Sequence, residues 1–358
     1  MRRHSTIVLV GGLLVGVVSF TVIRPDVTPP TARAMTPVTT VTSVALPSKV
    51  ETTITSSIVT STTAAPVTSL VIQGVGDVNF DPLYITEFAD AGYEIAFAGI
   101  DGLFHEDDLT VINLECPPTD VGTQLDKDYS FRCDPAALPI AASAGIDVAN
   151  LANNHGQDRG VEGMLDAVAN LSAAGIAPVG VGSDAAEANA PALFDIGGRT
   201  VAVLGMGGVV PGDSWLATED GPGMADGDDI GVMTAAVARA AEIADVVVVT
   251  IHWGRELVIE PDEGDRARAE AMVEAGADVI FGHHPHRLGE LAFVDGAPVF
   301  WTLGNFVWPK LSIEGATTAV ARVVIEPTGE ITACLLPAFI ESSGQPVLTG
   351  DRRCEGEL

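Results

Sequence analysis

The chain has 358 residues, which is enough to bury the core of one large domain or two ordinary ones. It carries 48 acidic against 18 basic side chains, a formal net charge of -30. Such a surface repels nucleic acid and anionic lipid headgroups, so we expect neither as a partner, although acidity alone also serves to keep a secreted protein soluble.

The first 27 residues have the pattern of a segment that directs a chain to a membrane. Arg2 and Arg3 precede an apolar run from Ile7 to Ile23, and Arg24 closes it. A run of about seventeen residues is at the short limit for a spanning helix and long for the core of a signal peptide. The positive charges before the run would hold the N-terminus in the cytoplasm. We predict a single-pass cell-membrane protein with an extracellular domain. Secretion after signal cleavage is the alternative.

Composition divides the rest of the chain into three parts. Residues 28–67 are rich in Thr, Ser and Pro and lack periodicity, which predicts a disordered stalk. Residues 68–345 alternate apolar runs with Ala-rich helical patterns and are predicted to form one α/β domain, followed by a tail at 346–358.

Within that domain the apolar pattern predicts elements in a regular order. Strands are expected at 70–76, 109–113, 147–151, 177–181, 200–204, 246–249 and 278–281, and helices at 136–144, 160–173, 232–243 and 266–275. The four valines at 246–249 are typical of a strand buried on both faces. From Glu290 onward the helices are expected to stop, and hairpins are expected around Asp295-Gly296 and Thr328-Gly329.

Four cysteines follow the apolar run, in a compartment where disulfides persist. Three pairings are open to four cysteines. We favour Cys116 with Cys133 and Cys334 with Cys354, because each pair closes a short local loop.

Residue types that bind divalent metals recur where predicted strands end. Five short motifs follow these strands; three of them contain five of the seven histidines of the chain, and the other two contain carboxylates and amides. The motifs are Gly76-Asp77-Val78-Asn79, Asn113-Leu114-Glu115, Asn153-Asn154-His155, His252-Trp253-Gly254 and Gly282-His283-His284-Pro285-His286. Because loops leaving the carboxyl ends of strands converge at one edge of an α/β sheet, the motifs together predict a metal site.

Each motif alone has an ordinary structural explanation. Asp77 could cap a turn, and Asn154-His155 could open the next helix. Glu115 and His252 are harder to explain this way, because each follows an apolar strand and would need a polar partner. His284 and His286 are expected to face the same side of an extended segment, since alternate residues do so.

The order of these motifs, followed by Leu303-Gly304-Asn305-Phe306, resembles the CapA family of capsule-synthesis proteins. That family is linked to poly-γ-glutamate capsule production and is similar in fold to the calcineurin-like metallophosphoesterases. The resemblance implies a four-layer α/β/β/α metallophosphatase-like sandwich with mixed sheets. It implies metal ligands at Asp77, Glu115, Asn154, His252, His284 and His286.

The same resemblance implies supporting roles for other residues. His155 would be the acid or substrate-contacting group, and Arg132 a contact to an anionic substrate, although a salt bridge would also explain Arg132. Residues that would orient the ligands are Asn79, Asn113, Glu256 and Asn305.

Two residues depart from the phosphoesterase pattern. Asn79 stands where those enzymes carry a His, and Glu115 replaces their bridging Asp. The loss of one imidazole should weaken one of two metal positions, so one or two ions of Mn, Fe or Zn are expected.

Two functions follow from these residues. One is a metal-dependent hydrolase or transferase acting on an anionic cell-envelope polymer such as poly-γ-glutamate, in a possible membrane synthase complex. The other is a non-catalytic polymer-binding or export factor, in which the metal bridges polymer carboxylates to the acidic protein.

Overall fold

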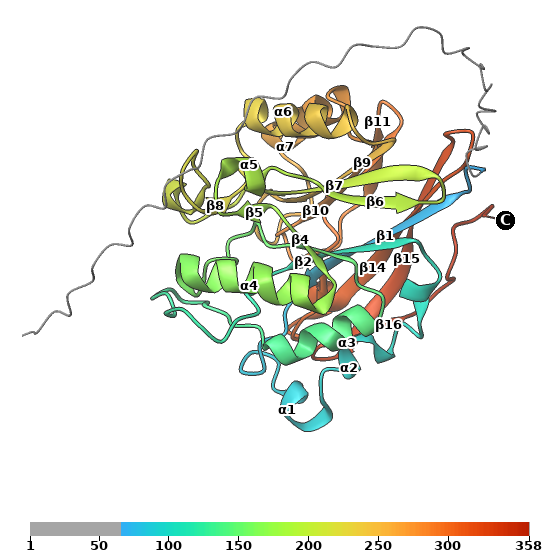
Figure 1. Cartoon of the computed structure of the whole chain (residues 1–358). Helices are drawn as coiled ribbons and strands as arrows, with labels where there is room; N and C mark the ends of the chain where they lie inside the picture. Colours follow the sequence, from blue (N-terminus) through green and yellow to red (C-terminus); the bar gives the residue numbers. More distant parts are fainter. Residues whose placement is uncertain (1–65, 358) are drawn as a thin grey trace, which may run out of the picture. The chain divides into compact units, whose positions relative to one another are not determined.

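The computed structural model describes residues 66–357, and two packed β-sheets form the centre of this part of the chain (Figure 1). The first sheet has the order β16-β15-β14-β1-β2-β3-β4, with β13 beside β1. Its strands are β1 (Leu70–Val78), β2 (Leu109–Leu114), β3 (Val148–Asn150), β4 (Ala177–Val179), β13 (Asn305–Val307), β14 (Thr317–Ile325), β15 (Ile331–Ser342) and β16 (Gln345–Leu348).

The second sheet has the order β11-β12-β10-β9-β7-β6. Its strands are β6 (Ala192–Ile196), β7 (Arg199–Gly207), β9 (Val246–His252), β10 (Val279–His283), β11 (Leu291–Val294) and β12 (Ala297–Phe300), and β5 (Val181–Gly182) pairs separately with β8 (Gly223–Met224). Both large sheets are mixed: β1, β2, β3 and β4 run parallel to one another, as do β7, β9, β10 and β12. The antiparallel pairs are β1–β14, β14–β15 and β15–β16 in the first sheet and β6–β7 and β11–β12 in the second.

Helices cover the outer faces of the two sheets. In Figure 1, α6 and α7 lie over the second sheet and α3 and α4 lie on the opposite side, against the first. The helices are α1 (Glu87–Ala91), α2 (Ile95–Ala98), α3 (Leu138–Ser143), α4 (Gly160–Ala174), α5 (Ala185–Ala188), α6 (Ile230–Ala241), α7 (Glu263–Glu274) and α8 (Ile313–Ala316), with 3-10 turns at Leu103–His105, Pro135–Ala137 and Asp213–Trp215.

Three apolar cores separate these layers, and β9 shows how one strand serves two of them. Val246 and Val248 point into the core between the sheets, while Val247 and Val249 point toward α6 and α7. Because successive side chains of a strand face opposite sides, an unbroken apolar run is what a strand covered on both faces requires. The predicted four-layer α/β/β/α sandwich with mixed sheets is confirmed.

Local sequence signals set the long helices. Asp229 caps α6 by accepting hydrogen bonds from the backbone N–H of Gly231 and Val232. Asp262 and Asp265 form a capping box at the start of α7. Each cap satisfies backbone donors that the first turn leaves unpaired.

Several features of the fold differ from the sequence analysis. The strand expected at 177–181 breaks at Gly180, whose φ of 81° turns the chain from β4 into the separate β5–β8 pair. The short helix α8 lies beyond Glu290, where no helix was expected. The fold also continues past residue 345, because β16 pairs with β15 as far as Leu348.

Both predicted disulfide pairings are present, Cys116 with Cys133 and Cys334 with Cys354. The second ties residues beyond β16 to β15, and Glu357 adds an ion pair to the buried Arg322. Within residues 66–357, no helix is long and apolar enough to cross a membrane. The predicted signal anchor or signal peptide and nearly all of the stalk fall on residues 1–65, outside the described residues.

Candidate metal centre

The predicted ligands converge where the parallel strands of the two sheets end. Asp77 lies near the end of β1, and Glu115 directly follows β2. His252 is the last residue of β9, and His283 is the last residue of β10. The first sheet therefore contributes carboxylates and the second contributes imidazoles, as expected at the carboxyl edge of parallel strands.

A buried group of three side chains forms the centre of this edge. Ligand atoms of Asp77, Glu115 and His252 all lie within 4.8 Å of one another, and each residue is completely buried. The Nδ1 atom of His252 is 3.3 Å from Oε1 of Glu115. Two carboxylates and an imidazole at this spacing could hold a divalent metal ion.

Asn113 joins the three members of this group. Its Nδ2 atom lies 2.8 Å from Oδ1 of Asp77, 3.4 Å from Oε1 of Glu115 and 3.1 Å from Nδ1 of His252. An amide nitrogen has only two hydrogens, so it cannot donate to three acceptors at once. The cluster therefore has more buried acceptors than donors, and Oε2 of Glu115 has no hydrogen-bond partner.

His286 is the cationic partner of the two carboxylates. Its Nδ1 atom is 2.9 Å from Oδ2 of Asp77, and its Nε2 atom is 3.8 Å from Oε2 of Glu115. Burial alone would lower the pKa of His286, but the charges of Glu115 and Asp77 outweigh it and raise that pKa to about 9. Burial opposes the ionisation of Asp77, and His286 favours it. The net effect is that the pKa of Asp77 is lowered.

Among the described residues, the carboxylate of Glu115 has no cationic group as close to it as His286 is to Asp77. Burial, followed by repulsion from Asp77, raises the pKa of Glu115 well above its ordinary value. Burial, followed by the neighbouring His284, lowers the pKa of His252 well below its ordinary value, so that imidazole is neutral. With both carboxylates ionised, one imidazolium would face two buried negative charges, and a bound cation would offset this surplus and satisfy the unpaired acceptors.

His284 and His286 reach the site through a turn, and the predicted extended segment is wrong. Their φ angles are 97° and 54°, in the left-handed region that residues with a Cβ rarely adopt. The ring of His284 nevertheless lies 4.8 Å from that of His252 and 6.1 Å from that of His286, and its Nδ1 atom has no hydrogen-bond partner. Unusual backbone at two ligand candidates so close in the chain is typical of functional sites.

Two amides connect to the histidines. Oδ1 of Asn154 accepts from Nε2 of His252 at 3.0 Å, which places this predicted ligand at the cluster. Oδ1 of Asn305 accepts from Nδ1 of His286 at 2.9 Å, while its Nδ2 donates to the carbonyl of Gly315 at 2.9 Å. Asn305 therefore links the imidazole of His286 to the backbone of Gly315, a position from which it could orient a ligand.

Asn79 and Glu256 do not contact the ligand atoms in this way. Oδ1 of Asn79 accepts from the backbone N–H of Asp81 at 2.8 Å, and its Nδ2 reaches only the backbone carbonyl of Glu115, at 3.5 Å. Glu256 is exposed at the rim of the cavity above the cluster.

His155 lies beside the cluster in a separate polar network. Its Nδ1 atom is 2.8 Å from Oδ2 of Asp158, and Lys127 reaches Oδ1 of the same carboxylate at 2.5 Å. Burial lowers the pKa of His155, although Asp158 partly opposes this shift. Asp158 is completely buried and also accepts from the backbone N–H of Phe131 at 2.7 Å, so it fixes both the imidazole and the 117–132 loop.

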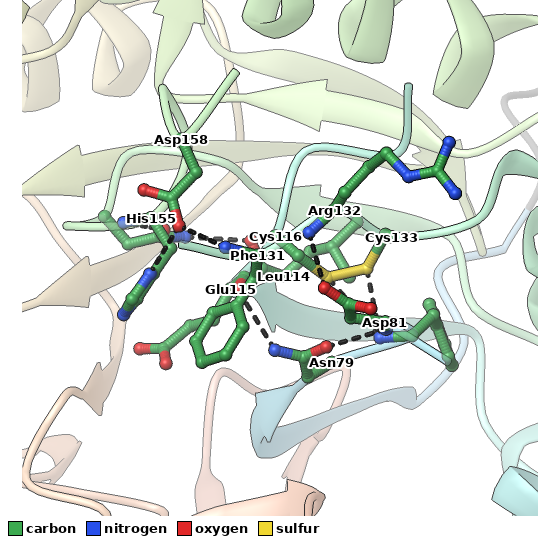
Figure 2. The surroundings of a disulfide bond; sticks show 12 residues. Asn79, Asp81, Leu114, Glu115, Cys116, Phe131, Arg132, Cys133, His155 and Asp158 are labelled. Carbon is green, nitrogen blue, oxygen red and sulfur yellow. Dashed lines mark hydrogen bonds and ion pairs between the residues drawn. A yellow bond between two sulfur atoms is a disulfide. The ribbon is translucent and has the colours of Figure 1, made fainter. Parts of the chain in front are cut away.

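Arg132 is not brought into the cluster. Its guanidinium pairs with the exposed Asp120 at 2.9 Å, and only its backbone N–H points inward, donating to Asp81 at 2.8 Å. Figure 2 shows its side chain directed away from Glu115 and His155, on the side of the cluster where the Cys116–Cys133 disulfide lies. Arg132 therefore forms a salt bridge, which was the alternative explanation for this residue.

A cavity of about 540 Å³ opens above the cluster, with Asn154, His284, His286 and Asn305 in its lining. Aromatic rings of Tyr84, Phe131 and Trp308 form one wall, with Tyr84 and Phe131 4.5 Å apart. Such a cavity, apolar with a few convergent polar groups, is the usual form of a small-ligand site.

Several residues of this site were not selected from the sequence. His283 belongs to a motif that was recognised, and its Nδ1 atom lies 3.7 Å from Oδ1 of Asp77. Asp158 lies three residues after His155, a spacing that could have indicated the pair. Nothing in the sequence distinguished Lys127 or Trp308, because their contacts come from segments far apart in the chain.

Fold and site together define a class: a two-sheet α/β sandwich with a buried carboxylate–imidazole group that could hold a metal ion. The model of the family described as "Bacterial capsule synthesis protein PGA_cap" matches residues 71–310. The chain belongs to this family of capsule synthesis proteins.

Two curated relatives support this placement. The PGA biosynthesis protein CapA of Bacillus subtilis (strain 168) is 31% identical over 239 residues, 66% of this chain and 62% of its own length. The capsule biosynthesis protein CapA of Bacillus anthracis is 31% identical over 229 residues, 63% of this chain and 55% of its own length. The match therefore spans less than two thirds of either relative.

Among solved structures, a hypothetical protein from Thermus thermophilus aligns over 75% of this chain and 99% of its own, with 14% identity and a TM-score of 0.44.

Proposed function

We propose that this protein acts in the synthesis or export of an anionic capsule polymer such as poly-γ-glutamate, as a metal-dependent hydrolase or transferase. The observation that carries the proposal is the buried Asp77–Glu115–His252 group beneath an aromatic-walled cavity. The family's role in capsule synthesis supplies the substrate class.

The residues that would hold the metal are Asp77, Glu115, Asn154, His252, His284 and His286. A bound divalent ion would supply Lewis-acid polarisation of a substrate oxygen and a more acidic water. Asn113 and Asn305 hold the ligand side chains in place through the hydrogen bonds described above. His155, oriented by Asp158 at the edge of the cavity, would move a proton to or from the substrate.

The protein would carry out this reaction outside the cytoplasm. The apolar run before Arg24 supports a membrane tether, and the two disulfides support an oxidising compartment. A membrane-bound polymer synthase is the proposed partner, because a tethered enzyme would meet the polymer where it emerges.

Metal content tests this proposal directly. Full-length protein in detergent, dialysed and measured by elemental analysis, should retain one or two equivalents of Mn, Fe or Zn. Two equivalents would support a two-metal hydrolase, and one a mononuclear site. Protein that stays metal-free after reloading would refute the proposed centre.

A non-catalytic polymer-binding factor is the second candidate, and Asn79 favours it. Its side chain is committed to Asp81 and to the backbone of Glu115, so it offers nothing to a second metal position. Replacing His155 by Ala separates the candidates. If the variant keeps its metal and loses polymer processing, catalysis is supported. If it keeps both its metal and polymer processing, His155 is not the proton-transfer residue.

A further inference from the structure

Arg287 is a half-buried cation in the wall of the cavity, directly after the ligand candidate His286. One nitrogen of its guanidinium, Nη1, donates to the backbone carbonyl of His286 at 2.8 Å. The same nitrogen lies over Gly315, where a Cβ atom would come within 3.1 Å of it. The carbonyl and the space left by glycine hold the guanidinium at the cavity.

No carboxylate among residues 66–357 lies within ion-pair distance of this guanidinium. Its charge acts only from further away on the exposed Glu314, whose pKa is lowered by local hydrogen bonds and, to a smaller extent, by Arg287. The arginines that form ion pairs there, Arg132, Arg268, Arg322 and Arg352, pair with acidic side chains of the protein itself. Lys127, the other strong base lining the cavity, is held by Asp158. In a chain with 48 acidic residues, an arginine in a cavity without an acidic partner leaves most of its five N–H donors for a ligand.

We propose that Arg287 binds an anionic oxygen group of the substrate, a carboxylate or a phosphate, beside the metal centre. This role rests on the proposed function and assigns to Arg287 the contact that the sequence analysis gave to Arg132. The planar guanidinium fits a two-oxygen anion. Arg287 is thus a specificity-determining residue for polyanionic substrates.

Binding measurements on metal-loaded full-length protein test this role. The probes are a soluble γ-glutamate oligomer, the corresponding neutral γ-glutamine oligomer, glutarate and inorganic phosphate. Arg287→Gln removes the charge, Arg287→Lys keeps the charge without the planar fork, and Arg132→Gln is the matched control outside the cavity. Metal content and melting temperature are recorded for every variant, so a misfolded protein is recognised.

Arg287→Gln should weaken the binding of the γ-glutamate oligomer about 10- to 100-fold, the range for a lost charge-assisted hydrogen bond. The affinity for the neutral oligomer and the metal content should stay unchanged. Arg287→Lys should recover part of the affinity, and Arg132→Gln should bind as wild type. Wild-type affinity in Arg287→Gln, or a loss confined to Arg132→Gln, would overturn the role of Arg287 while leaving the proposed function standing.

Two further results distinguish this role from the proposed function. If phosphate or glutarate binds through Arg287 and the oligomer does not bind at all, the anion site stands and the polymer proposal fails. If wild-type protein with a full complement of metal binds none of the anions, both fail.

Discussion

Replacing Glu115 by Gln should stabilise the metal-free protein and greatly reduce its stabilisation by metal. Glutamine keeps an oxygen that can accept from Asn113 but removes the buried carboxyl group, which the folded protein must hold protonated at a cost in free energy above pH 4.5. The Asp77–His286 pair remains intact. Burial of an uncompensated polar group costs about 1–3 kcal/mol, and each kcal/mol moves the melting temperature of a domain of this size by about 2–4 °C. We expect metal-free Glu115→Gln to melt a few degrees above metal-free wild type.

With metal bound, wild type should instead melt above the Glu115→Gln variant. At a free metal concentration about 100 times the Kd, binding stabilises the folded state by about 2.7 kcal/mol, or roughly 5–10 °C. The variant lacks a ligand carboxylate and should gain much less. Differential scanning calorimetry with EDTA and with Mn²⁺ or Zn²⁺ measures both effects, and Glu256→Gln at the exposed rim serves as the control.

The dependence on pH gives an independent check. Because burial raises the pKa of Glu115 above its ordinary value of 4.5, the folded state holds this proton more tightly than the unfolded state. The burial penalty is absent below pH 4.5 and grows as the pH rises above it. The metal-free variant and wild type should therefore converge in acid. A variant that melts lower than wild type without metal, or gains as much from metal, would refute the charge argument.

Three other results are expected. Asp77→Ala and His284→Ala should each lower metal content measured by elemental analysis, and unchanged stoichiometry in either would contradict the proposed ligand set. His155→Ala should keep the metal and stop polymer processing, because its contacts are with Asp158 and Lys127 and not with the carboxylate pair. Thiol titration should find no reactive thiol in the native protein and four after reduction and unfolding, whereas any native thiol would contradict the two disulfides.

The fold and the meeting of the motifs could be predicted because both depend on local patterns. Val246 to Val249 form a run typical of a strand buried on both faces, and polar residues that follow such strands lie together at the sheet edge. The disulfide pairs could be predicted for the same reason, since each closes a short loop. In these cases the spacing along the chain determined the spacing in the fold.

Side-chain direction could not be predicted in the same way. Arg132 and Arg287 are both arginines close to motif residues, yet only Arg287 faces the cavity. The guanidinium of Arg132 pairs with Asp120, whereas the guanidinium of Arg287 occupies space that Gly315 leaves because it has no side chain. The left-handed φ angles of His284 and His286 likewise reflect the surrounding tertiary structure and leave no mark in the sequence.

Ligand geometry depends on how closely the two sheets pack, because oxygen ligands come from one sheet and nitrogen ligands from the other. Gly74 of β1 marks one close approach of the two sheets, since a Cβ atom there would lie 2.8 Å from the ring of Phe281 on β10. The ring is enclosed between the sheets and cannot move aside freely. Gly74→Ala should push β10 away from β1, separate Asp77 from His286, and weaken metal binding without touching a ligand. Gly212→Ala, where a Cβ meets open space, is the matched control. Equal metal affinity in both variants, measured by competition with a chelator, would show that sheet spacing does not control the site.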